Sequence, residues 1–233
     1  MSQAIYPLSQ WSFNQEVSHV FDNHVRQSVP LYDSMQQVIT QLSDFFVQPN
    51  TVIYDLGCAT GETIFHINQR HKEKKATFIG IDDSESMLQK AIEKNHDHEH
   101  IHFVHQSIEN YTFEQKSNLI LSVLTIQFIP IEKREMVIRN IYNALNKGGA
   151  FLFVEKCYAE QSKIQDIFTQ LYHDEKEIHG LTPQEIREKD KSLRGVLNSM
   201  TAVENNQLLQ SSGFSTVEVF FKYLNFTGFL AIK

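Results

Sequence analysis

The sequence predicts an α/β protein built on a doubly wound, mostly parallel sheet. Thr51–Leu56 is a short apolar run rich in β-forming residues, and a glycine turn leads from it into a helix-like stretch, Glu62–Arg70. Ala76–Ile81 is a second such run, again followed by a helical pattern. Ala150–Glu155 is almost continuously apolar, as expected of a parallel strand that is covered on both faces. This alternation of buried strands and helices indicates the fold class.

The glycine turn after the first strand is the first candidate binding element. In T-V-I-Y-D-L-G-C-A-T-G, Gly57 and Gly61 stand four residues apart, with Cys58 between them and Asp55 just before. Glycines let the backbone approach a ligand, and the following helix offers free N–H groups. The spacing fits neither the dinucleotide fingerprint nor a phosphate-binding loop, and Asp55 favours a cationic group over a phosphate. A turn that merely connects two elements is the alternative.

An acid at the tip of the second strand is the second candidate. Ala76–Ile81 ends in Asp82-Asp83-Ser84. A carboxylate here, a couple of dozen residues after the glycine turn, is placed to bind both hydroxyls of a ribose, and we assign that role to Asp82. Asp83 or Ser84 has the simpler alternative of capping the helix that follows.

The other elements follow from apolar spacing and cap residues. In chain order they are a helix that begins at Asp33 or Ser34, a strand at Ile101–Gln106, a strand at Asn118–Leu124, a helix at Glu132–Leu145 closed by Gly148 or Gly149, a helix at Asn205–Ser211, and two final strands at Ser215–Lys222 and Leu224–Ile232. The apolar faces expected of the first helix, of the helix after Ser84 and of the helix at Glu132 comprise Met35, Val38, Ile39, Leu42, Phe45 and Phe46, then Met87, Leu88, Ala91 and Ile92, then Met136, Val137, Ile141 and Leu145.

Two additions extend the predicted sheet within a single domain spanning 1–233. Residues 1–48 precede the first strand and are expected to cover the mouth of the binding site. Residues 158–206 are much longer than a simple connection, and T-P-Q-E at Thr182 and T-A-V-E at Thr201 are capping boxes that predict several short helices. Both additions should roof the end of the sheet where open α/β folds bind ligands.

Composition and charge narrow the function classes. The net charge of −7 and the pI near 5.9 argue against a broad nucleic-acid surface. The first ten residues have neither a basic start nor an apolar core, so we expect no signal peptide, and no apolar stretch is long enough to span a membrane. A cytoplasmic protein with Cys58 and Cys157 reduced is expected. The histidine-rich tract from His96 to His105 is interpreted as a polar loop, without a metal.

The motifs resemble those of a known family. D-L-G-C-A-T-G and G-I-D-D-S are similar to motifs I and II of the class I S-adenosylmethionine-dependent methyltransferases, and L-N-K-G-G-A-F-L-F-V resembles the loop and fifth strand of that fold. The resemblance runs from Val52 to Lys233. It implies a Rossmann-like sheet of seven strands with the last strand antiparallel, and S-adenosyl-L-methionine as cofactor. Asp55, Gly57 and Gly61 match the loop positions.

The same resemblance assigns further binding residues. Ser107 and Ile108 lie where this fold recognises adenine, so Ile108 can pack on the ring. Family members often carry Asp at the Ser107 position, for which a hydroxyl is a weaker substitute. Tyr32, near the start of its helix, could reach a ligand, with packing as the alternative reading.

Several pieces resemble one branch, the carboxy-S-adenosylmethionine synthases, which convert the sulfonium methyl into a carboxymethyl using prephenate. The pieces are F-D-N-H-V, S-V-P-L-Y, V-Q-P-N-T-V-I-Y-D-L-G-C, T-I-Q-F, V-E-K, H-D and L-N-F. This likeness implies that Tyr32, Gly57, Asp82, Asp83 and Ile108 line the cofactor site and that the protein is a homodimer.

Two positions depart from that branch. Asp190 stands where the branch has an arginine that pairs with the carboxylate of the carboxymethyl sulfonium, and a carboxylate there would repel it. Lys189 or Lys191 could stand in. Val123 stands where the branch has an asparagine in the fourth strand.

The sequence therefore favours an S-adenosylmethionine-dependent methyltransferase acting on a small molecule. His173 with Asp174 is the candidate base for the acceptor. Carboxymethyl chemistry and a non-catalytic, cofactor-binding subunit are the alternatives.

Overall fold

The computed structural model describes residues 11–233, and it contains one seven-stranded sheet with the order β3-β2-β1-β4-β5-β7-β6. All neighbouring strands pair in parallel except β7, which is antiparallel to both β5 and β6. The predicted fold class is confirmed. The strands are β1 (Val52–Leu56), β2 (Thr77–Asp82), β3 (Ile101–His105), β4 (Ser117–Val123), β5 (Leu145–Lys156), β6 (Thr216–Tyr223) and β7 (Phe226–Ile232).

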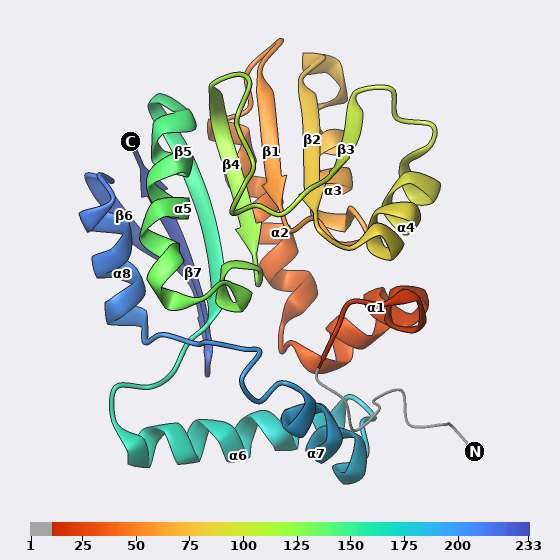
Figure 1. The fold of residues 1–233 in the computed structure, drawn as a ribbon, viewed down its shortest axis with the longest axis vertical. Helices are drawn as coiled ribbons and strands as arrows, with labels where there is room; N and C mark the ends of the chain where they lie inside the picture. Colours follow the sequence, from red (N-terminus) through yellow and green to blue (C-terminus); the bar gives the residue numbers. More distant parts are fainter. Residues whose placement is uncertain (1–10) are drawn as a thin grey trace.

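Helices cover both faces of the sheet and one of its ends. They are α1 (Gln15–Ser28), α2 (Tyr32–Leu42), α3 (Glu62–His71), α4 (Glu85–Asn95), α5 (Ile131–Ala144), α6 (Ser162–Ile178), α7 (Pro183–Ser192) and α8 (Ala202–Ser211). Figure 1 shows that the parallel strands point their carboxyl ends toward α1, α6 and α7, which lie across that end of the sheet. The candidate site is therefore expected between the strand ends and these three helices.

The alternation of side chains along the strands produces two cores. In β1, Tyr54 and Leu56 pack with α5 and α8, and Ile53 packs on the opposite face with α2 and α3. Both faces of the central strands are buried, which accounts for the continuous apolar runs in the sequence.

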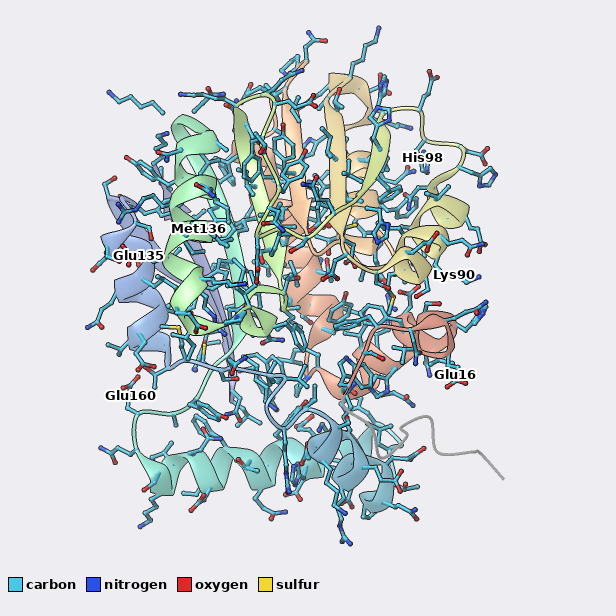
Figure 2. All side chains as sticks on the ribbon, in the orientation of Figure 1. Glu16, Lys90, His98, Glu135, Met136 and Glu160 are labelled. Carbon is cyan, nitrogen blue, oxygen red and sulfur yellow. The ribbon has the colours of Figure 1, made fainter. Side chains whose placement is uncertain are left out.

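Three predicted core residues lie outside the core. Phe45, Ile92 and Met136 are 75%, 55% and 49% exposed, and Figure 2 labels Met136 on α5. Periodicity identifies the apolar side of a helix, but the margin of that side is buried only where another element covers it. These three predictions were wrong for that reason.

Two helix ends also differ from the prediction. Helix α2 begins at Tyr32 after Leu31, which adopts the left-handed conformation, so neither Asp33 nor Ser34 is its cap. Helix α5 ends at Ala144 because Leu145 is already extended, and Gly148, with φ +77°, lies inside β5 instead of closing the helix.

The capping predictions for the later helices are confirmed. Ser84 caps α4 by accepting a hydrogen bond from the Met87 N–H, and Thr182 and Thr201 form capping boxes with Glu185 and Glu204. The insertion differs from the expected series of short helices in that α6 spans 17 residues.

Residues 1–10, where a signal peptide was judged absent from the sequence, lie outside the described residues. In the described part of the chain, no helix combines the length and apolar character needed to cross a bilayer. Cys58 and Cys157 are both buried free thiols.

Candidate active site

A cavity of about 400 Å³ lies at the carboxyl ends of the strands. The strand tips of β1, β2, β4 and β5 contribute to it, and residues of α1, α2, α6 and α7 close it from the other side. Every residue assigned to cofactor binding from the sequence lines this cavity except Gly61, namely Tyr32, Asp55, Gly57, Cys58, Asp82, Asp83, Ser107 and Ile108.

The glycine turn is fixed by its backbone. Gly57 has φ +72°, and a Cβ at this position would collide with the side chain of Thr125. The N–H groups of Gly57 and Cys58 donate to the Ile81 carbonyl at 2.7 and 3.1 Å, which fastens the turn to the end of β2. Gly61, with φ +74°, is the N-cap of α3. The turn needs glycine at both positions.

Asp82 lies at the predicted tip of β2 and is held by two backbone donors. Its Oδ2 accepts from the Ala59 N–H at 2.9 Å and its Oδ1 from the Ser84 N–H at 2.9 Å. A carboxylate has about four lone-pair sites, so both oxygens can also accept from ligand hydroxyls. Burial raises the pKa of Asp82. The remaining acceptor sites of this carboxylate suit a ribose, whose two hydroxyls can donate to them.

Asp55 is 2% exposed and has no cationic partner that affects its charge within the described residues. Burial, helped by the negative charge of Asp82, raises the pKa of Asp55 to about 7. Two carboxylates that destabilise each other's charge favour a cation between them or beside them. The acidic end of the cavity, defined here as Asp55, Asp82 and Asp83, therefore suits a positively charged sulfonium nucleoside.

Residues beside these carboxylates complete the acidic end of the cavity. Ile108 packs against the core and lines the cavity, and Ser107 Oγ accepts from the Glu109 N–H at 3.3 Å. Tyr32 is 8% exposed, and its hydroxyl accepts from the Gln36 amide at 3.0 Å. Burial is the largest cause of the raised pKa of Tyr32, so its hydroxyl stays protonated.

The chain before α1 crosses the tip of β2. The Phe13 carbonyl accepts from the hydroxyls of Ser84 and Ser86 at 2.6 and 3.1 Å. The Phe13 ring meets Phe128 edge-on with centroids 5.3 Å apart, and the Trp11 N–H donates to the Ser192 carbonyl at 2.9 Å. This segment joins the acidic end to α7.

The cavity lining also contains lysines. Lys156, the last residue of β5, and Lys189 on α7 both line the cavity, and Lys176 of α6 is 2% exposed. Burial lowers the pKa of Lys156 to about 8, and it also lowers the pKa values of Lys176 and Lys189. The neighbouring ammonium groups depress one another further. We call Lys156, Lys176 and Lys189 the lysine cluster.

Asp190 forms ion pairs with two residues of α6. Its Oδ2 lies 2.8 Å from His173 Nε2 and its Oδ1 lies 3.5 Å from Lys176 Nζ. Asp190 is not among the described residues that line the cavity, whereas its neighbour Lys189 is. Val123, the other departure from the branch pattern, lines the cavity.

The pair assigned to catalysis lies elsewhere. Neither His173 nor Asp174 is among the described lining residues of the cavity. His173 pairs with Asp190, and Asp174 is exposed and accepts from the Gln170 side chain at 3.0 Å. The structure thus brings together the predicted cofactor residues but not the predicted base.

Sequence reasoning missed Trp11, His24, Tyr172, Lys156 and Lys176, and it named Lys189 only as an alternative to Lys191. His24 lines the cavity, its Nε2 lies 3.0 Å from Ser28 Oγ, and burial with the nearby charges of Lys189 and Lys176 lowers its pKa to about 3. The position of Lys156 directly after a buried strand was a usable signal, since strand ends face the site in this fold. His24, Tyr172 and Lys176 come from helices with many polar residues, and Trp11 precedes α1.

Residues 11–233 hold no group of three or more His, Cys, Asp or Glu side chains arranged for a metal ion. His98, in the histidine-rich tract, lies far from α6 and α7 in Figure 2.

The chain resembles known proteins over nearly its whole length. Residues 53–149 match the family model described as a methyltransferase domain. The carboxy-S-adenosyl-L-methionine synthase of Staphylococcus epidermidis is 39% identical over 225 residues, covering 96% of this chain and 97% of that protein. The chain belongs to the carboxy-S-adenosyl-L-methionine synthase family. A second member, from Methylococcus capsulatus, is 34% identical and covers 97% of this chain and 95% of its own length.

Solved structures agree on the fold of this family member. A putative O-methyltransferase from Nostoc punctiforme superposes with a TM-score of 0.67 at 16% identity over 94% of this chain and 59% of its own. Human N-acetylserotonin methyltransferase, solved with its cofactor, gives 0.66 at 16% identity over 94% and 56%. The protein is an S-adenosylmethionine-dependent enzyme with a class I methyltransferase fold, as predicted.

Proposed function

We propose that the protein is a carboxy-S-adenosylmethionine synthase, the activity in the name of its relatives, and that it transfers a carboxyl group to the methyl carbon of S-adenosylmethionine. The transformation of S–CH₃ into S–CH₂–COO⁻ removes one proton and adds one CO₂. A donor such as prephenate balances both changes, because the ring that loses its carboxylate as CO₂ expels its hydroxyl and becomes aromatic, and the expelled hydroxide takes the methyl proton to form water. Prephenate is the donor that the family resemblance implies.

One observation carries the choice of carboxyl transfer over methyl transfer. The substitution of Asp190 for the branch arginine argues against a carboxylated ligand only if the Asp190 carboxylate faces that ligand. Asp190 instead pairs with His173 and Lys176, whereas Lys156 and Lys189 are among the residues that line the cavity. The described lining of the cavity therefore includes lysines but not the Asp190 carboxylate.

Different residues of the chain would bind different parts of the cofactor. Asp82 would hold the ribose hydroxyls, and Ile108 would pack on the adenine. Asp55 would place a negative charge near the sulfonium, the group that makes the methyl reactive when the cofactor is bound. The apolar rings of Phe13, Phe128 and Tyr172 would exclude water from the remaining space.

Mass spectrometry of the reaction tests this function. Purified protein is incubated with S-adenosylmethionine with and without prephenate, and the sulfonium products are weighed. We expect a sulfonium heavier by one CO₂ that depends on prephenate. S-adenosylhomocysteine with a methylated acceptor would instead support methyl transfer, and turnover seen only with an added protein would support the cofactor-binding subunit.

The proposal also covers the role of the helical additions and the oligomeric state of the protein. Within 1–48 and 158–206, α1, α2, α6 and α7 would form a cover over the cavity in one domain of 233 residues. Exposed apolar residues on α6 support a homodimer, which light scattering can test; they are Ile164, Ile167, Leu171 and Ile178. A cytoplasmic location and the absence of direct nucleic-acid binding stay predictions.

A further inference from the structure

A polar cluster connects α1 to the glycine turn and to α4. Asp22, in α1, accepts a hydrogen bond through Oδ1 from the Thr60 hydroxyl at 2.5 Å, and its Oδ2 lies 2.5 Å from Lys94 Nζ. Lys94, on α4, also donates to the Thr60 hydroxyl at 3.3 Å. These three side chains join elements that lie far apart in the sequence.

A second contact from α1 reaches the other side of Gly61. Arg26, one helical turn after the aspartate, pairs with Glu62, the first residue of α3. Arg26 also pairs with Asp33 of α2 at 2.9 Å. Thr60 and Glu62 are the two chain neighbours of Gly61, so α1 is fastened to the turn on both sides of the glycine that caps α3.

The glycine turn connects these contacts to the carboxylate assigned to the ribose. Thr60 is 3% exposed and lines the cavity. The N–H of the preceding residue, Ala59, donates to Asp82 Oδ2 at 2.9 Å. Asp22 and Asp82 therefore hold neighbouring residues of one short turn, one from the covering helix and the other from the sheet.

Helix α1 also covers the cavity. Phe21 and Val25 of this helix line it, and Figure 1 shows α1 across the carboxyl end of the sheet. Asp22, Arg26 and Lys94 are not among the described residues that line the cavity. Their effect on a ligand must therefore pass through the turn or through the covering helix.

The two contacts of Asp22 differ in strength. The Thr60 hydroxyl is buried and needs an acceptor, and a hydrogen bond to a carboxylate is stronger than one to a neutral group. The side chains of Asp22 and Lys94 are 36% and 33% exposed, so water weakens their ion pair. The hydrogen bond to Thr60 is therefore the main connection between α1 and the turn.

We infer that Asp22 and Arg26 are positioning residues of the cofactor site. Through Thr60 and Glu62 they hold the glycine turn and the covering helix together around the nucleoside, and Lys94 keeps the Asp22 carboxylate in place. The inference rests on the proposed position of the cofactor at the acidic end. It goes beyond the proposed function because it applies to carboxyl transfer and methyl transfer alike.

The dissociation rate of S-adenosylhomocysteine tests the inference. Trp11, the only tryptophan of the chain, lines the cavity, so stopped-flow fluorescence can follow binding, and calorimetry gives the affinity independently. We expect Asp22→Ala to raise the dissociation rate about tenfold without lowering the association rate, because alanine preserves the helix. Asp22→Asn keeps an acceptor for the Thr60 hydroxyl and should raise the rate only about two- to threefold.

A double variant separates positioning from a general effect on stability. Thr60→Val removes the hydroxyl and should raise the dissociation rate several-fold. Asp22→Ala combined with Thr60→Val should release the nucleoside at nearly the rate of Asp22→Ala alone, because the two residues form one contact. Effects that multiply would mean that Asp22 merely stabilises α1, and they would refute the inference.

Two lysines of α4 supply a matched control. Lys94 reaches Asp22, whereas Lys90 pairs with Glu93 on its own helix. Lys94→Met should raise the dissociation rate about two- to threefold, and Lys90→Met should leave it unchanged. Equal effects of the two substitutions would contradict the role of Lys94.

Arg26→Met gives a second measure if Asp22→Ala fails to fold, as judged by its melting curve. It removes the pair with Glu62, and we expect the dissociation rate to rise several-fold. An unchanged dissociation rate in either variant, once it is shown to be folded, would overturn the role assigned to that residue.

The inference and the proposed function can fail independently. If Asp82→Ala leaves the affinity for S-adenosylhomocysteine unchanged, the proposed position of the cofactor is wrong. If Asp82→Ala weakens binding but Asp22→Ala and Arg26→Met release the nucleoside at the unaltered rate, only the positioning role is refuted. Carboxyl transfer is measured on the unaltered protein, so its failure would leave the positioning role standing.

Discussion

The acidic and basic ends of the cavity are built from different parts of the fold. The acidic end comes from two adjacent strand tips, Asp55 in β1 and Asp82 at the end of β2, which pair in one parallel register. The basic end, which is the lysine cluster, joins β5 to α6 and α7, helices that belong to the insertion. Strand tips in a sheet are positioned by the core, whereas the insertion can change without disturbing the sheet. The comparison teaches that cofactor recognition and co-substrate recognition can vary separately.

Removal of the Asp82 carboxylate should have the largest effect. Asp82→Ala deletes the acceptor for two backbone N–H groups and for the ribose hydroxyls. We expect S-adenosylhomocysteine affinity to fall by about a hundredfold in calorimetry. Asp83→Asn, at the adjacent residue, should change it little. Equal losses in the two variants would show that the acidic end acts by overall charge alone.

A methyl group at Gly57 should disturb the acidic end through the backbone. Gly57→Ala places a Cβ against Thr125 at a residue with φ +72°. We expect a loss of about 2 kcal/mol or more in unfolding free energy by denaturant titration, together with weaker cofactor binding. Gly148→Ala is the control, since φ is +77° there but no atom lies within 4 Å of the added Cβ. Similar losses in both would mean that backbone strain, not the clash, dominates.

Asp190→Asn should weaken the binding of phenylacetate at the basic end, and the loss should depend on pH. Phenylacetate is an aromatic carboxylate that serves as a probe for the proposed carboxyl donor. The negative charge of Asp190 raises the pKa of Lys156, which is about 8 in the folded protein. Without that charge the Lys156 pKa falls further, so phenylacetate affinity should decline at a lower pH than in the unaltered protein. Asp174→Asn, which changes an exposed neighbour of His173, should leave the pH dependence of phenylacetate affinity unchanged. An unshifted pH dependence in Asp190→Asn would contradict the influence of Asp190 on Lys156.

Ligand affinities at the two ends of the cavity should change with pH in opposite directions. These changes should be smaller than the effects predicted above. Asp55 has a pKa of about 7, next to Asp82 and the buried Cys58, and a bound cation would lower that pKa. Affinity for cationic S-adenosylmethionine should therefore rise several-fold between about pH 6 and pH 8, while phenylacetate affinity falls as Lys156 loses its proton. Asp55→Asn should remove the first trend and leave the second.

The sequence predicted the acidic end more completely than the basic end for a physical reason. Asp55 lies near the end of the first strand, Gly57 follows that strand directly and Asp82 ends the next strand, so local sequence pattern identifies all three positions. Lys189 lies in the polar run R-E-K-D-K-S, where no periodicity distinguishes it from Lys191. The difference arises from tertiary packing, because α7 packs against α6 and contributes Lys189 to the cavity lining. His173 was assigned as a base from its neighbour Asp174, but its actual partner is Asp190, one helix away.

A crystal structure with S-adenosylhomocysteine and phenylacetate bound together tests the two-ended cavity most directly. We expect the ribose hydroxyls at Asp82 and the phenylacetate carboxylate within hydrogen-bond distance of Lys156 and Lys189, with Asp190 still paired to Lys176. A phenylacetate carboxylate bound away from both lysines, or the amino-acid carboxylate of S-adenosylhomocysteine in their place, would contradict the account.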